Sequence, residues 1–172
     1  MSVPAAPTCW KAWMKNKRYV LLLAIAAIVF ALDQIAKFAI VKWMGERLSV
    51  EIIPGLFALV NVRNRGAAFG FLNRTDIEWQ IWLFAGATCV AVWAIFALAR
   101  NARPLMLTGL GLILGGACGN LLDRLRFQAV TDFLDFYWAD WHWPAFNIAD
   151  AAICIGVALA GLASFKTPER AA

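Results

Sequence analysis

The sequence predicts an all-α membrane protein with four transmembrane helices and a small extracytoplasmic β-sheet cradle. Of its 172 residues, 62% are apolar and only 16% are charged, whereas about a quarter of the residues in a soluble domain are charged. The apolar residues form four long runs, each near the ~20 residues that a helix needs to cross ~30 Å of hydrocarbon. Strand-like patterns lie between the first two runs.

The four spans belong to one integral membrane domain, residues 1–172. The predicted spans are residues 19–41, 79–99, 104–122 and 146–165. A cleaved signal peptide fits the first run less well, because its apolar pattern continues past Asp33 to Val41 and so exceeds the usual core of a signal peptide.

Charge placement predicts the orientation of the spans. Basic residues are concentrated in the two tails, residues 1–18 and 166–172, and in the link at 100–103. By the positive-inside rule, both termini are cytoplasmic. The sequence pI of about 9.3 then reflects topology and anionic lipid headgroups, and no basic, aromatic-rich surface indicates nucleic-acid binding.

Two segments are expected on the outer side of the membrane. Residues 42–78 contain alternating apolar and polar residues and then strand formers after Pro54-Gly55, which predicts a small antiparallel sheet. The apolar stretch at 69–72 is interpreted as lying in the membrane interface. Residues 123–145 are expected to form an outer loop that returns the chain to the fourth span.

The third span is rich in glycine. Gly111, Gly115 and Gly119 are spaced four apart and share one helix face, which allows another helix to approach closely. The four cysteines show neither metal spacing nor a paired arrangement outside the membrane, so they are interpreted as small packing residues.

Few residue types remain for catalysis. The three serines lie outside any Gly-x-Ser-x-Gly motif, and the lone His142 is interpreted as an interfacial residue. A single histidine excludes a His-Glu-x-x-His zinc site, and the sequence contains neither a nucleotide-binding loop nor a dinucleotide fingerprint. No metal and no cofactor are therefore expected.

Carboxylates are the remaining candidates. Asp132 and Asp150 are expected near the outer side, and Asn147 shares a helix face with Asp150. If the two carboxylates meet, they cannot both ionise easily, so they share a proton and one of them can activate water. Spacing alone leaves open whether they meet, and Asp150 is alternatively a helix-start residue that interacts with the N-terminal dipole.

Other charged residues have structural interpretations. Asp33 and Lys37 are four residues apart and are expected to pair inside the bundle. Arg124 offers a planar fork to a carbonyl or a phosphate, or it pairs with Asp123. Asp135 is interpreted as a solvated loop charge.

Five short motifs stand in a fixed order along these spans. They are Asp33-Gln34-x-x-Lys37, Asn64-Arg65-Gly66-Ala67-Ala68-Phe69, Gly115-Gly116-Ala117-Cys118-Gly119-Asn120-Leu121-Leu122-Asp123-Arg124, Val130-Thr131-Asp132-Phe133 and Phe146-Asn147-Ile148-Ala149-Asp150. In this order the motifs resemble those of the lipoprotein signal peptidases, the type II signal peptidases of bacteria. Thr131 replaces a valine that is more usual in that family, and another β-branched residue suits the same backbone.

The resemblance implies an aspartic endopeptidase of the bacterial inner membrane, with its active site at the periplasmic face. It implies cleavage of diacylglyceryl prolipoproteins just before the lipid-modified cysteine, with Asp132 and Asp150 as the catalytic pair. The positions matched to substrate binding or site support are Asp33, Lys37, Asn64, Gly66, Asn120, Asp123, Arg124, Phe146, Asn147 and Ala149. The implied partners are the prolipoprotein signal peptide, membrane lipids and globomycin-type inhibitors, and the chain is expected to be a monomer.

The sequence leaves two other functions open. A small proton-coupled transporter would use Asp33, Lys37 and Asp150 as a relay, although the spans show neither inverted-repeat symmetry nor a broken helix pair. A non-catalytic scaffold would bind a partner through the glycine face of the third span.

Overall fold

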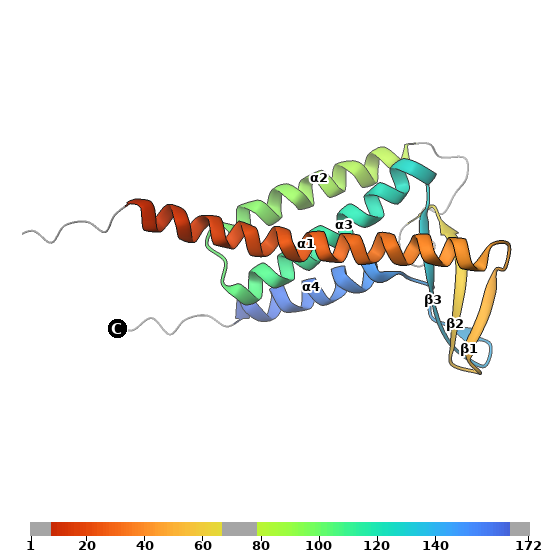
Figure 1. Cartoon of the computed structure of the whole chain (residues 1–172). Helices are drawn as coiled ribbons and strands as arrows, with labels where there is room; N and C mark the ends of the chain where they lie inside the picture. Colours follow the sequence, from red (N-terminus) through yellow and green to blue (C-terminus); the bar gives the residue numbers. More distant parts are fainter. Residues whose placement is uncertain (1–7, 67–78, 166–172) are drawn as a thin grey trace, which may run out of the picture.

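The computed structural model describes residues 8–66 and 79–165, with residues 8–16 described by their backbone alone. Four helices and a four-stranded antiparallel sheet make up this part of the chain (Figure 1). The predicted fold class is thereby confirmed. The predicted interfacial stretch at 69–72 and the C-terminal tail from residue 166 lie outside the described residues.

Each of these helices is long and apolar enough to cross a membrane. They are α1 (Thr8–Met44), α2 (Gln80–Ala99), α3 (Pro104–Phe127) and α4 (Ile148–Phe165). Large apolar side chains such as Trp93 of α2 and Val157 of α4 are more than half exposed. Such surfaces suit a lipid surrounding, in which apolar side chains need no cover from water.

The helix ends differ in part from the predicted spans. α3 continues beyond residue 122 to Phe127 and stops at Gln128, whose φ of 55° is left-handed and so ends the helix. α4 begins at Ile148 instead of residue 146, because Phe146 is still extended and pairs with Leu134 of the sheet.

The sheet has the strand order β1-β2-β3-β4. The strands are β1 (Ser49–Ile53), β2 (Phe57–Asn64), β3 (Val130–Trp138) and β4 (Trp141–His142). The sheet predicted in residues 42–78 corresponds to β1 and β2. Residues 123–145 differ from the expected loop, because they contribute the end of α3 and both remaining strands. The sequence of β3 is rich in β-branched and aromatic residues, which favour a pleated and partly buried strand.

The sheet lies at one end of the helix bundle (Figure 1). β3 follows α3 closely and α4 begins soon after β4, so the sheet, the end of α3 and the start of α4 meet there. The link between α2 and α3 lies at the opposite end, where Arg18 of α1 donates to the carbonyl of Arg100 at 2.9 Å.

α3 packs against each of the other three helices. A Cβ atom at Gly115 would lie only 2.5 Å from the carbonyl oxygen of Ala26 in α1, and one at Gly109 only 2.7 Å from that of Gly156 in α4. Glycine alone permits these approaches, because any side chain would collide with the neighbouring backbone. The glycine face predicted from the sequence lies against α1 and leads directly to the polar residues at the end of α3.

Candidate active site

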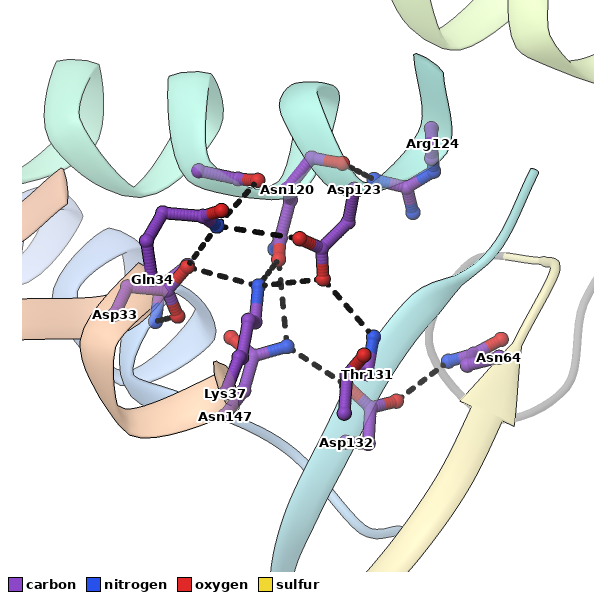
Figure 2. A network of polar contacts seen from close by, with 12 residues as sticks. Asp33, Gln34, Lys37, Asn64, Asn120, Asp123, Arg124, Thr131, Asp132 and Asn147 are labelled. Carbon is purple, nitrogen blue, oxygen red and sulfur yellow. Dashed lines mark hydrogen bonds and ion pairs between the residues drawn. The ribbon is translucent and has the colours of Figure 1, made fainter. Parts of the chain in front are cut away.

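A cavity of about 550 Å³ opens at the sheet end of the bundle. Its wall combines the end of β2, the start of β3, the end of α3 and the first turns of α4. The residues predicted for the site that line it are Asn64, Gly66, Asn120, Arg124, Asp132, Phe146 and Asp150. Figure 2 shows several of these side chains linked to one another by hydrogen bonds.

Asp132 and Asp150 face the same cavity and share a partner. Asp132 lies in β3 and is 3% exposed, and Asp150 lies in the first turn of α4. The side-chain amide of Asn147 donates to Asp132 Oδ1 at 2.7 Å, and the backbone N–H of Asn147 donates to Asp150 Oδ2 at 3.2 Å. The structure therefore brings together two carboxyl groups whose meeting the sequence left open.

Asn147 also starts α4. Its Oδ1 accepts the backbone N–H of Asp150 at 3.0 Å, while the Asp150 carboxylate accepts the N–H of Asn147. This reciprocal arrangement is a capping box, which satisfies two N–H groups that have no partner inside the helix. The alternative role of Asp150 at a helix start is thus also present, and the helix itself fixes the position of its carboxyl group.

Asn120 of α3 connects Asp150 to a buried cation. Its Nδ2 donates to Asp150 Oδ1 at 2.8 Å, and its Oδ1 accepts from Lys37 Nζ at 2.9 Å. Because the ammonium group polarises the amide, the amide N–H becomes a stronger donor to the carboxylate. Each oxygen of Asp150 therefore accepts one hydrogen bond, and both bonds stabilise negative charge on it.

Lys37 lies in a buried cluster with two aspartates. Its Nζ is 2.8 Å from Asp33 Oδ2 and 3.2 Å from Asp123 Oδ2, and all three side chains are almost completely buried. The predicted pairing of Asp33 with Lys37 is confirmed, and Asp123 is a third member. Removing one charge from such a cluster would leave the others buried without compensation.

The same cluster fixes the backbone next to both cavity aspartates, and Figure 2 shows the bond from Thr131, beside Asp132, to Asp123. Asp33 Oδ1 accepts the backbone N–H of Ala149 at 3.0 Å. Asp123 Oδ2 accepts the backbone N–H of Thr131 at 3.1 Å. Each donor directly precedes one of the cavity aspartates in the sequence, so α1 and α3 hold β3 and α4 in place through side-chain carboxylates.

Gln34 belongs to this cluster, although no site role was predicted for it. Its Nε2 lies 3.1 Å from Asp33 Oδ2, 3.2 Å from Asp123 Oδ1 and 3.3 Å from the carbonyl oxygen of Gly119. Gln34 therefore bridges the two carboxylates and ties them to α3. Its place beside Asp33 in the first motif was the available signal.

Asn64 binds the second oxygen of Asp132. Its Nδ2 donates to Asp132 Oδ2 at 3.0 Å, and its Oδ1 accepts the backbone N–H of Gly66 at 3.0 Å. Arg124 Nη2 donates to the carbonyl of Gly66 at 3.2 Å, and its guanidinium lies over the ring of Phe84, 4.1 Å from the ring centre. The fork of Arg124 thus holds the chain beyond β2 by a backbone carbonyl.

The environment of Asp132 favours its protonated form. Burial raises its pKa to about 6, and the nearby negative charge of Asp150 acts in the same direction. The hydrogen bonds from Asn64 and Asn147 and the positive charge of Lys37 oppose this rise in pKa. Asp132 therefore holds a proton much closer to neutral pH than an exposed aspartate does.

Asp135 and His142 form a pair elsewhere on the sheet. His142 Nδ1 lies 2.9 Å from Asp135 Oδ2, and Asp135 is only 8% exposed. The interpretation of Asp135 as a solvated loop charge is therefore wrong. The reason is that residue 135 lies within β3, where the imidazole of the short strand β4 is placed beside its carboxylate.

Among the side chains that the structure describes, in residues 17–66 and 79–165, no group of three or more His, Cys, Asp or Glu is arranged to hold a metal ion. The expectation of a metal-free and cofactor-free site stays a prediction.

Comparisons with known proteins identify the family. The family model described as signal peptidase (SPase) II, Peptidase_A8, matches residues 25–166. The chain is 55% identical over 158 residues to the lipoprotein signal peptidase of Nitratidesulfovibrio vulgaris strain DP4, a match that covers 91% of this chain and 96% of the relative. It is 54% identical over 151 residues to the lipoprotein signal peptidase of Oleidesulfovibrio alaskensis, covering 87% of this chain and 97% of the relative.

Two solved structures of a bacterial membrane enzyme have the same fold. The first has a TM-score of 0.75 and is 30% identical in sequence, and the match covers 88% of this chain and 93% of that one. The second has a TM-score of 0.71 and is 31% identical, and the match covers 86% of this chain and 94% of that one. The resemblance carried by the five motifs is thereby confirmed. With its four candidate spans, the sheet at one end of its helix bundle and these relatives, the chain belongs to the signal peptidase II family of membrane peptidases.

Proposed function

We propose that this protein is an aspartic endopeptidase that removes the signal peptide from diacylglyceryl-modified prolipoproteins. Asp132 and Asp150 activate a water molecule, which cuts the peptide bond just before the lipid-modified cysteine. Membership of the signal peptidase II family supports lipoprotein processing. The observation that carries the aspartic mechanism is that Asn147 binds both carboxyl groups at the wall of one cavity.

The surroundings of the two carboxyl groups suggest a role for each. Asp132 is buried, and burial raises its pKa to about 6; we place the proton that the pair shares on this residue. Asp150 lies at a helix N-terminus, where the dipole favours negative charge, and it accepts from the amide that Lys37 polarises. Asp132 is therefore the proton donor and Asp150 the base.

The reaction then runs in two steps. Asp150 takes a proton from the water molecule while the water oxygen attacks the scissile carbonyl carbon. At the same time Asp132 gives its proton to the carbonyl oxygen, and a neutral diol forms. Asp150 next protonates the amide nitrogen of the leaving lipidated cysteine, while Asp132 recovers a proton from the diol. The C–N bond breaks, a carboxylic acid and an amine are formed, and the pair returns to its starting state.

The charge distribution supports the orientation that this function needs. The α2–α3 link lies at the end of the bundle opposite the sheet. Arg100 and Arg103 belong to this link, and Arg18 near the start of α1 bonds to it. Positive residues of this kind face the cytoplasm. We therefore place the termini in the cytoplasm of a bacterium and the cavity at the periplasmic face of its inner membrane. A diacylglyceryl substrate keeps its acyl chains in the bilayer while its cleavage point reaches that face.

The proposed partners follow from this location. They are the signal peptide of the prolipoprotein, membrane lipids, and inhibitors of the globomycin type that compete for the cavity, with the protein acting as a monomer. The transporter alternative has less support, because Asp33 and Lys37 are bound to one another and to Asp123, Gln34 and Asn120 in a buried cluster.

The test uses purified protein in detergent with a synthetic diacylglyceryl prolipoprotein. We expect Asp132→Asn and Asp150→Asn each to lower turnover by about 10³-fold or more, while circular dichroism shows an unchanged helix content. Asp140→Asn, at an exposed turn of the sheet, is the matched control and keeps wild-type turnover. Mass spectrometry should find the lipidated cysteine at the new N-terminus. Turnover by either cavity variant, or a cut at another bond, contradicts the proposal.

A further inference from the structure

Arg63 makes contacts near the site that no predicted role explains. It lies in β2 directly before Asn64, and its register partner in β3 is Thr131. Its Nη1 donates to Thr131 Oγ1 at 2.9 Å. Thr131 is only 2% exposed and directly precedes Asp132. The hydrogen bond therefore joins the two residues that stand beside Asn64 and Asp132.

A second contact ties the same guanidinium to α3. It lies over the ring of Phe127, the last residue of α3, at 4.8 Å from the ring centre. A guanidinium at this distance is attracted to the aromatic face, and its hydrogen bond to the hydroxyl is charge-assisted. Arg63, Thr131 and Phe127, here called the Arg63 clasp, thus connect β2, β3 and the end of α3.

The sheet needs such a connection at this point. The register between β2 and β3 shifts between Leu59 and Val62, and an irregularity of this kind disrupts the regular ladder and bends the strand. Asn64 lies beyond the shift and must still reach Asp132 Oδ2 at 3.0 Å. The contact between Arg63 and Thr131 lies beyond the shift. It therefore fixes the position of the end of β2, which the backbone hydrogen bonds alone define less strongly.

We propose that Arg63 is a positioning residue, which acts through Thr131 and Phe127 to hold the Asn64 amide against the catalytic carboxyl group of Asp132. The inference rests on the proposed aspartic dyad for its effect on turnover. The contact itself is independent of that mechanism and can be measured separately.

The pH dependence of turnover reports this positioning. The Asn64 hydrogen bond lowers the pKa of Asp132 against the effect of burial. The other charged groups around Asp132 are Asp150 of α4, Lys37 of α1 and Arg124 of α3. We expect these three groups to keep their places when the clasp is lost, because none of them contacts Arg63 or Thr131 through its side chain in the contacts described above. Loosening Asn64 therefore raises the pKa of Asp132, and the shared proton is then lost at a higher pH.

Thr131→Val and Thr131→Ser form the first matched pair of variants. Valine keeps the branched shape and removes the hydroxyl, whereas serine keeps the hydroxyl. We expect Thr131→Val to lower kcat about tenfold, as for one lost charge-assisted hydrogen bond, with little change in KM. In the plot of kcat against pH, the alkaline limb of Thr131→Val should move to higher pH. Thr131→Ser should behave as wild type. Equal losses in both variants, or a lower thermal midpoint without a shifted limb, overturn the proposal.

Arg63→Leu and its double variant with Thr131→Val complete the test. Arg63→Leu should show at least the same loss and pH shift, and the double variant should be no worse than Arg63→Leu alone, because Arg63→Leu already removes the hydrogen bond that Thr131→Val removes. Arg126→Leu, an exposed arginine near the end of α3, controls for the lost charge. Additive losses in kcat and in thermal stability overturn the clasp. If the stability losses of the Arg63 and Thr131 variants are not additive but Asp132→Asn still turns over substrate, the clasp is supported and the aspartic dyad is refuted.

Discussion

Asn147 and Asp150 cap one another across the first turn of α4. Asn147 Oδ1 accepts the N–H of Asp150 at 3.0 Å, and Asp150 Oδ2 accepts the N–H of Asn147 at 3.2 Å. The side-chain amide of Asn147 also donates to Asp132 at 2.7 Å. One asparagine therefore joins the start of a helix to both carboxyl groups, so the geometry of the site is part of the geometry of the fold.

This relationship predicts that fold and chemistry can be separated at Asp150 but not at Asn147. An asparagine at position 150 still offers an oxygen to the N–H of residue 147 but loses the acceptor for Asn120 Nδ2. Asp150→Asn should therefore lose turnover while keeping a thermal midpoint above that of Asn147→Ala. Asn147→Ala removes the cap, which costs about 1 kcal/mol, and also frees Asp132. Thermal unfolding in detergent checks both variants, and equal midpoints for them would contradict the capping box.

Asp132 gives a pH dependence of stability with a definite sign. The pKa of Asp132 is about 6 in the folded protein, above its ordinary value of 3.8. Protonated Asp132 therefore stabilises the fold fully below a pH of 3.8, and this contribution is lost as the pH rises from there through about 6. The full effect is about 3 kcal/mol. Asp132→Asn cannot ionise, so its midpoint relative to wild type should rise across this window. A difference in midpoint that stays constant with pH would show that ionisation of Asp132 does not affect stability.

Lys37→Met should destabilise the protein strongly. It leaves Asp33 and Asp123 buried without a cation, and breaking a buried ion pair in this way costs about 3–5 kcal/mol. Adding Asp33→Asn to Lys37→Met should restore part of the loss, because one uncompensated charge is removed. Lys42→Met, at an exposed position near the end of α1, is the control. Yield and thermal midpoint in detergent are the measurements, and a Lys37→Met protein as stable as the control contradicts the cluster.

The close packing of α3 on α1 gives a further prediction. In Gly115→Ala the new methyl group would collide with the carbonyl oxygen of Ala26 and with Val29, and such overpacking costs about 1–3 kcal/mol. A Cβ at Gly86 of α2 meets nothing within 4 Å. Gly86→Ala should therefore be neutral or gain up to about 1 kcal/mol from helix propensity. Comparable thermal midpoints for the two variants would show that α3 and α1 can separate without loss.

The helices were predictable because their signals are local. Each span is a continuous apolar run of sufficient length, and Gly115 lies on a face that four-residue spacing defines. The pairing of β3 with β2 was not predictable in this way. The bond from Asn64 to Asp132 joins residues 68 positions apart, and no local periodicity encodes such a partner. The carboxylates within β3 also made its segment look like a solvated loop.

The polar site was predictable in its members and not in its connections. The motifs pointed to Asn120, Asn147 and both cavity aspartates, and the structure gathers them. Which amide serves which carboxylate depends on the packing of helices that are distant in sequence. Gln34 was missed for the same reason, because its role is to bridge the carboxylates of Asp33 and Asp123, which belong to two different helices.

An infrared difference spectrum of the carboxylic acid C=O stretch, taken for wild type and for Asp132→Asn near the pH at which turnover is greatest, would detect the proton that Asp132 and Asp150 share. We expect the band of one protonated carboxyl group in wild type, absent from Asp132→Asn and shifted in Asp150→Asn. A wild-type spectrum without that band, or an unchanged band in Asp132→Asn, would contradict a proton shared by Asp132 and Asp150.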